Sequence, residues 1–442
     1  MRGAMLQQIR RLSDKTRFIP SEGYYPRGFT VTGLHCGVKK DPTKLDLALI
    51  HSTAPCTAAA VFTQNKFTAA PVQVSRAVLE ARQGAGIHSI VTNSGCANAV
   101  TGAEGLVNAR KMGQAVERAA QWGSTSVSES DLPGSTLIMS TGVIGQPIPL
   151  PRIEDGIQRA FPALGRSHEH WLKFSQAYMT TDTFPKLRSR PFQLPSGTQY
   201  RMAGVSKGAG MIHPNMATLL GTIATDLPVS PACLQAALSY AVDRSFNAIT
   251  IDGDTSTNDT VAILANGQTN SGNSLTIADQ KSTDFVAFRD QLTEFARDLA
   301  QLVVRDGEGA TKFITVRVKN AANFADAKSI ATTIATSSLV KTAIYGQDAN
   351  WGRIICAVGY TKDVAVDTQT ISLQVIPMDG SAPLPLMVRG EPEKVDEARA
   401  LEILKMEDIN IEVDLGLGEA TAEVYTCDMS HEYITINADY RS

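Results

Sequence analysis

The sequence predicts a mixed α/β fold. Short runs of β-branched and apolar residues, broken by glycine, proline and asparagine, extend from Gly28 to about Thr63 and return from Ile87 to Val91, which is typical of strands and turns. Later in the chain, apolar residues recur at every third or fourth position, as on the buried face of a helix. With 442 residues the chain is long enough for two structural units.

The composition excludes several classes of function. A formal net charge of -3 with 19% charged residues predicts no strong attraction to nucleic acid or to an anionic membrane. No apolar run approaches the roughly 20 residues of a membrane-spanning helix. The six cysteines are scattered without a C-x-x-C pair, so we expect neither a disulfide scaffold nor a metal site. Small molecules and other subunits are the expected partners.

Residues 1–27 form a basic amino-terminal segment. Its first 17 residues hold a single acid, Asp14, against five cations, namely Arg2, Arg10, Arg11, Lys15 and Arg17. This bias is compatible with a short mitochondrial targeting segment. It is equally compatible with an ordinary basic chain end, and composition leaves both interpretations open.

Helices are predicted where apolar residues repeat with a period near 3.6 or where a capping pattern begins one. The clearest runs from Phe285 to Leu302, and Ser230 followed by Pro231 is a typical helix start. The remaining helical patterns cover Leu106 to Ala119, Trp171 to Ala177, and Asp326 to Leu339.

Strands are predicted where short β-branched runs lie between turn residues. These runs are Leu137 to Met139, Gln199 to Ala203, Phe313 to Val318, Ile409 to Leu415, Ala420 to Thr426, and a tail starting at Ile434. The apolar run that begins at Leu219 suits a buried strand or the start of a buried helix, because so short a run does not separate the two.

The chemistry is expected at the junction between Lys207 and Asp226. Gly208 and Gly210 permit backbone angles closed to other residues, and Pro214 fixes its own φ, so the loop before Thr218 has a defined shape. Taken alone, a threonine at the edge of a buried element is usually a core hydroxyl.

Three further patterns suggest other chemistry. Gly204 to Gly208 satisfies G-x-S-x-G, the nucleophile elbow of serine hydrolases, with Ser206 as nucleophile. The glycines and proline that follow make the required helix improbable. Cys96 has no charged activator beside it, so a structural thiol is expected. Asp252 to Asp259 lacks the glycine and glutamate of a calcium loop, and a polar turn near the active site is expected instead.

The junction sequence K-G-A-G-M-I-H-P-N-M-A-T-L-L closely resembles the processing site of the ornithine acetyltransferases, also called glutamate N-acetyltransferases. The resemblance implies self-cleavage between Ala217 and Thr218, giving an α chain from residue 28 to 217 and a β chain from 218 to 442. It also implies a layered α/β sandwich that differs in topology from the amino-terminal nucleophile hydrolases. After cleavage Thr218 would carry both a hydroxyl, which acts as nucleophile, and a free α-amine, which accepts the proton. The pKa of such an amine is typically about 7.7 to 8.0.

Other motifs support the same resemblance and imply roles for their residues. The S-T-G-V-I-G string contains the oxyanion-hole residues Thr141 and Gly142, and T-T-D-T contributes a substrate contact at Thr180, with Thr181 as the less favoured choice. The remaining implied substrate contacts are Lys207 for the α-carboxylate, Glu308 for the amine, and Asn437 and Ser442 at the chain end, where many relatives end in threonine. A further signature, G-Q-D-A-N-W-G-R from Gly346 to Arg353, is given only a packing or interface role.

The implied enzyme moves an acetyl group from N2-acetyl-L-ornithine to L-glutamate in arginine biosynthesis, by a ping-pong path through acetyl-Thr218. It needs no cofactor, and acetyl-CoA as an additional donor is left open. The implied assembly is an α2β2 heterotetramer in the mitochondrial matrix. Three alternatives stay open: an amidase or aminopeptidase that uses Thr218, a serine hydrolase that uses Ser206, and an uncut metabolite-binding protein.

Overall fold

A computed structural model describes residues 13–120, 134–213, 219–269 and 276–438. Its strands are β1 (Phe29–Leu34), β2 (Leu47–Phe62), β3 (Ile87–Cys96), β4 (Thr136–Val143), β5 (Lys186–Gln193), β6 (Gln199–Lys207), β7 (Leu220–Thr225), β8 (Thr260–Ala265), β9 (Phe313–Ala321), β10 (Ser372–Pro377), β11 (Leu384–Val388), β12 (Glu391–Pro392), β13 (Asp408–Asp414) and β14 (Ala420–Cys427). Its α-helices are α2 (Ala70–Arg82), α3 (Gly102–Ala119), α4 (Leu150–Ala160), α5 (His168–Tyr178), α6 (Pro231–Asp243), α7 (Thr283–Arg305), α8 (Phe324–Thr336), α9 (Ser338–Tyr345), α10 (Trp351–Gly359), α11 (Glu397–Lys405) and α12 (His431–Ala438).

The first structural unit is built on one strongly bent sheet. Its strand order is β4-β3-β2-β8-β7-β6-β5, and β1 pairs with β2. The bend lies in β2, because residues 47–51 pair with β3 whereas residues 57–62 pair with β8, and the register shifts between His51 and Cys56. The long strand therefore carries the chain from one half of the sheet to the other.

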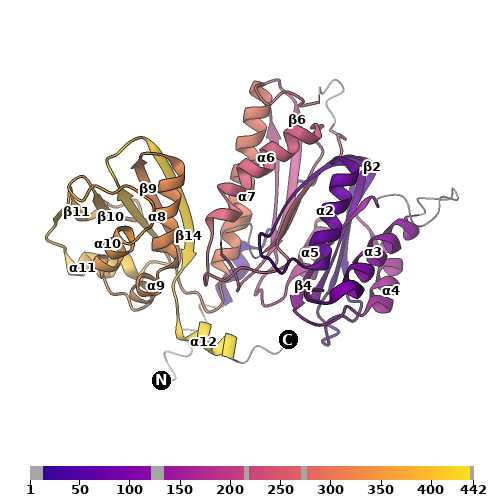
Figure 1. The fold of residues 1–442 in the computed structure, drawn as a ribbon, viewed down its shortest axis with the longest axis horizontal. Helices are drawn as coiled ribbons and strands as arrows, with labels where there is room; N and C mark the ends of the chain where they lie inside the picture. Colours follow the sequence, from indigo (N-terminus) through magenta and orange to yellow (C-terminus); the bar gives the residue numbers. More distant parts are fainter. Residues whose placement is uncertain (1–12, 121–133, 214–218, 270–275, 439–442) are drawn as a thin grey trace.

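The two halves of this sheet face each other across a shared core. The Tyr178 hydroxyl on α5 accepts a hydrogen bond from Thr92 Oγ1 on β3 at 2.9 Å and lies 2.8 Å from Thr222 Oγ1 on β7. The buried apolar side chains between the halves come from both of them. Helices α2, α3 and α4 cover one outer face, and α6 and α7 cover the other (Figure 1). The predicted layered α/β sandwich is confirmed.

The second structural unit is a smaller α/β layer with its own core, in which helices α8 to α11 pack on a six-stranded sheet (Figure 1). The sheet order is β12-β11-β10-β13-β9-β14. Arg305, the last residue of α7, donates two hydrogen bonds to the Asp408 carboxylate at 2.8 and 2.6 Å. Thr250 N donates to Tyr425 O on β14 at 2.9 Å. These contacts fix the second unit against the first.

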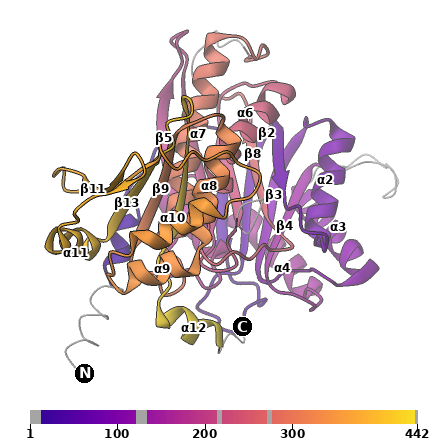
Figure 2. The ribbon, with the colours of Figure 1, turned by 60° about the vertical axis from the view of Figure 1, so that its left-hand side comes forward.

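The carboxyl-terminal tail differs from its prediction. Ile434 lies in α12 and not in a strand, and this helix follows β14 and lies beneath both units (Figures 1 and 2). Helical contacts appear within it, since Thr435 Oγ1 donates to His431 O and Asn437 Nδ2 donates to Tyr433 O, four residues back in each case. An alternation of only three residues was too short to separate the two periodicities.

Most other predicted elements are confirmed, with one correction. Ser230 caps α6 by accepting a hydrogen bond from Cys233 N, and the predicted 285–302 helix is α7. The predicted helix from Asp326 to Leu339 is instead two helices. It divides because Ser337 leaves α8 in an extended conformation and caps α9 by accepting from Val340 N.

Part of the basic amino-terminal segment packs on the folded body. Lys15 Nζ lies 3.5 Å from Asp306 Oδ1, and the Tyr25 ring stacks on Trp171 with centroids 4.9 Å apart. Within the ranges that the structure describes, none of the helices combines the length and apolar character needed to cross a bilayer.

Candidate active site

The two oxyanion candidates lie at the end of β4 beside β3. Thr141 pairs with Ser94 and Gly142 with Gly95 in the parallel register of these strands. Gly142 has φ +127°, and a Cβ built on it would lie 2.3 Å from the Gly95 carbonyl carbon. Only glycine fits this position, because both the backbone angle and the closeness of β3 exclude a side chain.

Two asparagines that sequence reasoning missed hold this strand end in place. Asn93 accepts a hydrogen bond from Ser140 Oγ at 2.6 Å and donates one to Cys96 O at 2.8 Å. Asn258 Nδ2 donates to Ala97 O at 2.6 Å and to Ser140 O at 2.9 Å. Both side chains are buried, and their hydrogen bonds tie Ser140, the residue before Thr141, to the end of β3. The polar string that contains Asn258 was the only signal for its role.

Lys207 is a nearly buried cation at the end of β6. Its residue is 9% exposed, and it lies opposite Leu220, the first residue of β7. Among the described residues its ammonium donates no side-chain hydrogen bond. Burial lowers the pKa of Lys207, and the Lys186 charge adds to this, whereas the carboxylates of Asp182, Asp259 and Glu308 act in the opposite direction. A buried ammonium of this kind is suited to an anionic group of a ligand.

A buried ion cluster joins Lys207 to the segment that contains Thr180. Lys186 Nζ lies 2.5 Å from Asp182 Oδ1 and 2.6 Å from Asp306 Oδ2, and all three side chains are fully buried. Asp182 also accepts hydrogen bonds from Gly208 N at 2.8 Å and from Thr180 N at 2.9 Å. Asp182 therefore holds both the residue after Lys207 and the backbone of Thr180.

The ammonium and carboxylate groups of this cluster stabilise each other in their charged forms. Burial alone would raise the pKa of Asp182, but the Lys186 and Lys207 ammonium groups hold it well below its usual range. For Lys186, burial alone would lower the pKa, and the Asp182 and Asp306 carboxylates raise it above its usual value. This cluster was not predicted from the sequence, although Asp182 lies in the T-T-D-T string and Lys186 follows that string closely.

Glu308 joins the same region from the loop after α7. Its N–H donates to Ala209 O at 2.8 Å, and its Oε2 accepts a hydrogen bond from Asn437 Nδ2 at 2.8 Å. A Cβ on Gly210 would lie 2.4 Å from Glu308 Oε2, so glycine is needed for this close approach. The structure thus brings Lys207, Glu308 and Asn437 together from three distant parts of the chain.

Three predicted site residues lie outside the described residues: Ala217, Thr218 and Ser442. The chain is described up to His213 and again from Leu219. Before that interval, Asp252 accepts hydrogen bonds from Met211 N at 2.6 Å and Ile212 N at 2.9 Å. The predicted polar turn at Asp252 therefore anchors the chain that leads to the expected cleavage point.

The alternative nucleophiles have unsuitable surroundings. Ser206 lies within β6, paired to Lys186 on β5 and Gly221 on β7, so the elbow turn that a serine hydrolase requires is absent there. Its hydroxyl is buried and donates to Leu299 O at 3.2 Å. Burial raises the pKa of the Cys96 thiol, which donates to Gln146 O. The geometry therefore does not support the Ser206 alternative, and the surroundings of Cys96 agree with the structural role expected for it.

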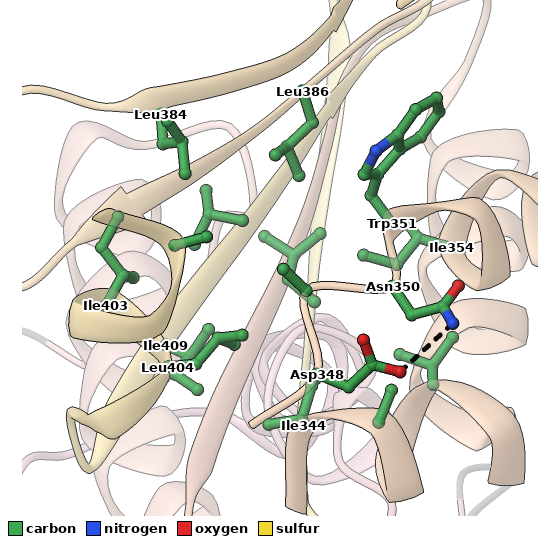
Figure 3. A pocket seen from close by; sticks show the side chains of 16 residues that line it. Ile344, Asp348, Asn350, Trp351, Ile354, Leu384, Leu386, Ile403, Leu404 and Ile409 are labelled. Carbon is green, nitrogen blue, oxygen red and sulfur yellow. Dashed lines mark hydrogen bonds between the residues drawn. The ribbon is translucent and has the colours of Figure 1, made fainter. Parts of the chain in front are cut away.

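Residues 348–351 of the signature line an apolar cavity in the second unit (Figure 3). Asn350 Nδ2 donates to Asp348 Oδ2 at 3.2 Å on one side of this cavity, and Trp351 and Ile354 follow on α10. The cavity has a volume of only about 40 Å³, which is too small for a metabolite. This observation agrees with a packing role for the signature.

The sequence of this chain is similar to known proteins over nearly its whole length. The model of the ArgJ family matches residues 30–442. The mitochondrial arginine biosynthesis bifunctional protein ArgJ of Ajellomyces capsulatus is 57% identical, over 97% of this chain and 92% of its own length. The corresponding protein of Aspergillus terreus is 56% identical, over 97% of this chain and 95% of its own length. A solved structure of ArgJ from Bacillus halodurans is 40% identical, covers 50% of this chain and 97% of its own, and has a TM-score of 0.45.

The chain therefore belongs to the ArgJ family. The resemblance inferred from the junction sequence is confirmed, as is the expectation that the protein is an enzyme, an acyltransferase of arginine biosynthesis.

Proposed function

We propose that this enzyme transfers the acetyl group of N2-acetyl-L-ornithine to L-glutamate, after cutting its own chain between Ala217 and Thr218. One observation carries the proposal. A buried cation, Lys207, lies at the start of the segment that leads to Thr218, and a carboxylate, Glu308, contacts that same segment. An α-amino acid with a cationic side chain requires opposite charges of this kind within one site.

In the first half-reaction the Thr218 hydroxyl attacks the acetyl carbonyl, and its own α-amine accepts the hydroxyl proton. Negative charge then develops on the carbonyl oxygen. The Thr141 hydroxyl and the Gly142 N–H donate hydrogen bonds to it, and loss of one such donor typically costs about 10²- to 10³-fold in rate. Collapse of the intermediate breaks the amide bond, the amine returns its proton, and ornithine leaves.

In the second half-reaction glutamate takes the acetyl group from Thr218. Its amine attacks the ester carbonyl, the same donors stabilise the oxyanion, and the threonine hydroxyl is regenerated with N-acetylglutamate as product. Lys207 binds the α-carboxylate that both substrates share, which explains how one site accepts two amino acids in turn. Thr180 and Ser442 complete the contacts, and no cofactor takes part.

Glu308 and Asn437 recognise the side-chain end of ornithine. A carboxylate in a site of this low exposure attracts the ornithine ammonium more strongly than it would in water. The side-chain carboxylate of glutamate is repelled from the same position. We therefore propose that glutamate keeps its α-carboxylate at Lys207 and directs its side chain away from Glu308.

The sheet topology supports a processed enzyme whose two pieces stay together. Strands β7 and β8 follow the proposed cut, yet they lie between β2 and β6, which precede it. The pieces 1–217 and 218–442 therefore share one sheet and one core. We propose that they form the α and β chains of an α2β2 heterotetramer.

A mitochondrial matrix location is also proposed, because the curated fungal relatives are named as mitochondrial. Lys15 contacts Asp306 and is therefore part of the folded protein. For this reason we expect the targeting signal to lie mainly before Lys15. Fusing residues 1–12 to a fluorescent reporter tests this: import of the reporter is expected. A diffuse cytosolic signal from a fusion to residues 1–27 contradicts the location itself.

Amino-terminal sequencing of the purified subunits tests the central proposal. The expected result is a second amino terminus at Thr218, with a Thr218→Ala variant that stays uncut and inactive. Assays with N-acetylornithine then separate a transferase from a hydrolase, because glutamate should accelerate ornithine release and become acetylated. Indifference to glutamate favours the amidase or aminopeptidase alternative, and an active but intact chain overturns the nucleophile assignment.

A further inference from the structure

A second lysine, Lys39, lies beside the candidate active site in the loop between β1 and β2, and the proposed reaction gives it no role. Asp46, which directly precedes β2, is fully buried and fixes this loop. Its carboxylate accepts hydrogen bonds from three N–H groups of the loop, those of Cys36 at 2.6 Å, Gly37 at 3.1 Å and Lys39 at 2.9 Å. The backbone at Lys39 therefore has a defined position.

The side chain of Lys39 contacts two parts of the candidate site. A Cβ built on Gly95 would lie 3.2 Å from Lys39 Cγ, and Gly95 pairs with the oxyanion candidate Gly142. At its other end, Lys39 Nζ donates a hydrogen bond at 2.7 Å to Met179 O, in the residue before Thr180. Lys39 thus links the strand end beside the oxyanion candidates to the segment of the expected substrate contact.

The Lys39 ammonium forms no ion pair with a carboxylate among the described residues. It donates two hydrogen bonds, to the backbone carbonyls of Leu45 at 2.6 Å and Met179 at 2.7 Å. An ammonium has three N–H donors, so one is left for a ligand. Burial lowers the pKa of Lys39 to about 8, and the group therefore still carries its proton at neutral pH. A half-buried cation with a donor to spare is suited to an anionic group of a ligand.

Lys39 and Glu308 provide opposite charges near Lys207. Burial is the main cause of the lowered pKa of both lysines. Beyond burial, the Lys207 ammonium lowers the pKa of Lys39, and the Glu308 carboxylate raises the pKa of Lys207. Lys207 therefore lies within electrostatic range of both groups. A substrate whose α-carboxylate is held by Lys207 has an acid nearby for a cationic side chain and an ammonium nearby for an anionic one.

We propose that Lys39 binds the side-chain carboxylate of the glutamate acceptor and thereby determines which amino acid takes the acetyl group. The inference rests on the proposed function, because it assumes transfer from acetyl-Thr218 to an amino acid whose α-carboxylate is held by Lys207. The remaining N–H of Lys39 donates to the glutamate side chain, which Glu308 repels. The two substrates share one anchor and differ in the direction of their side chains, ornithine toward Glu308 and glutamate toward Lys39.

Lys39→Gln tests this role, because it removes the charge and keeps two N–H donors for the carbonyls of Leu45 and Met179. In a ping-pong path, kcat/KM for the acceptor reports the second half-reaction and kcat/KM for the donor reports the first. We expect kcat/KM for glutamate to fall about tenfold to 100-fold more than kcat/KM for N-acetylornithine, mainly through KM. Discrimination between glutamate and glutamine, its uncharged analogue, should fall by a similar factor.

Two further variants separate the charge of Lys39 from its structural contacts. Lys39→Arg keeps a cation and should retain most of the preference for glutamate. Lys44→Gln is the matched control, because it removes an exposed charge from the same loop, and its kinetics should match those of the wild type. Thermal denaturation shows whether each variant is folded. Lys39→Met, which has a side chain of similar length, replaces Lys39→Gln if the latter does not fold.

The outcomes distinguish this inference from the proposed function. Equal losses for glutamate and N-acetylornithine mean that Lys39 only supports the backbone before Thr180, and they overturn the inference. Unchanged kinetics in Lys39→Gln, or the same loss of glutamate preference in Lys44→Gln, overturn it as well. In each of these cases acetyl exchange by the wild type leaves the proposed function intact. A wild-type enzyme that does not transfer acetyl groups from N-acetylornithine to glutamate instead refutes the proposed function.

Discussion

Asn437 on α12 donates a hydrogen bond to Glu308 Oε2 at 2.8 Å, although 129 positions separate the two residues. This contact joins the last helix of the chain to the loop after α7. It makes the carboxyl-terminal region part of the candidate active site, because Glu308 N also donates to Ala209 O, two positions beyond Lys207. Three segments therefore have to be correctly folded before this site exists.

Asn437→Ala should weaken binding of the ornithine end of the donor. A hydrogen bond to a charged group contributes about 1.5 to 3 kcal/mol, so KM for N-acetylornithine should rise roughly tenfold to 100-fold. Steady-state kinetics measure this rise. Gln374→Ala is the matched control, because Gln374 Nε2 donates to Glu412 Oε1 at the same 2.8 Å within the second unit. An equal effect of both variants contradicts the assigned contact.

Asp182→Asn should move the alkaline limb of the pH profile. Burial lowers the pKa of Lys207 and the Asp182 carboxylate opposes this, so removing that charge lowers the pKa further. Lys207 then loses its proton, and its hold on the substrate carboxylate, at a lower pH. The measurement is kcat/KM against pH for both substrates. Asp306→Asn is the control, since it also deprives Lys186 of a carboxylate, and it should shift the limb less.

The same aspartate should affect stability in acid. Its pKa is held low in the folded protein, so its contribution to the free energy of unfolding is present above the unfolded pKa of about 3.9 and is lost as the pH falls below it. Urea unfolding at pH 7 and pH 3 should show a smaller loss for Asp182→Asn than for the wild type. The exposed variant Asp155→Asn, whose residue pairs with Arg159 on the surface, should behave like the wild type.

Thr141→Val should remove one donor to the oxyanion and preserve the shape of β4. We expect kcat for acetyl transfer from N-acetylornithine to fall about 10²- to 10³-fold, with little change in KM. Thr315→Val, in β9 of the second unit, is the control for the substitution itself. A Thr141→Val enzyme with nearly normal turnover rules out a catalytic role for that hydroxyl.

Ser206→Ala and Cys96→Ala should leave turnover within about twofold of the wild type, because each side chain only bonds to a backbone carbonyl. Each variant should lose about 1 kcal/mol in the free energy of unfolding, as is usual for one hydrogen bond. Thermal denaturation and the exchange assay together distinguish this loss from a catalytic defect. Abolished turnover in a folded Ser206→Ala enzyme revives the hydrolase hypothesis.

The sequence predicted long elements better than short ones. Helix α7 repeats its apolar face over 23 residues, so its period is unmistakable. The tail offered three alternating residues, and these form a helix. The division between α8 and α9 was missed because Ser337 interrupts one continuous apolar pattern, and only its capping bond to Val340 N marks the break.

The site was predictable only through local motifs. The resemblance selected Lys207 and Glu308 from strings of neighbouring residues. It did not reveal that Lys186 binds both Asp182 and Asp306, because the two carboxylates lie far apart in the sequence and no local pattern relates them. Nor did it show Asn258 bonded to Ser140 O. Contacts of this kind depend on sheet topology, which periodicity does not specify.

The interior position of β7 has a consequence for how active enzyme is made in the cell. This strand begins just after the proposed scissile bond and is held on both sides by β6 and β8. If the chain is cut as proposed, separately made fragments would have to insert this strand between two others, so we expect the uncut chain to fold first. On that proposal, a chain that does not reach its native fold is not cut and does not gain the amino-terminal nucleophile.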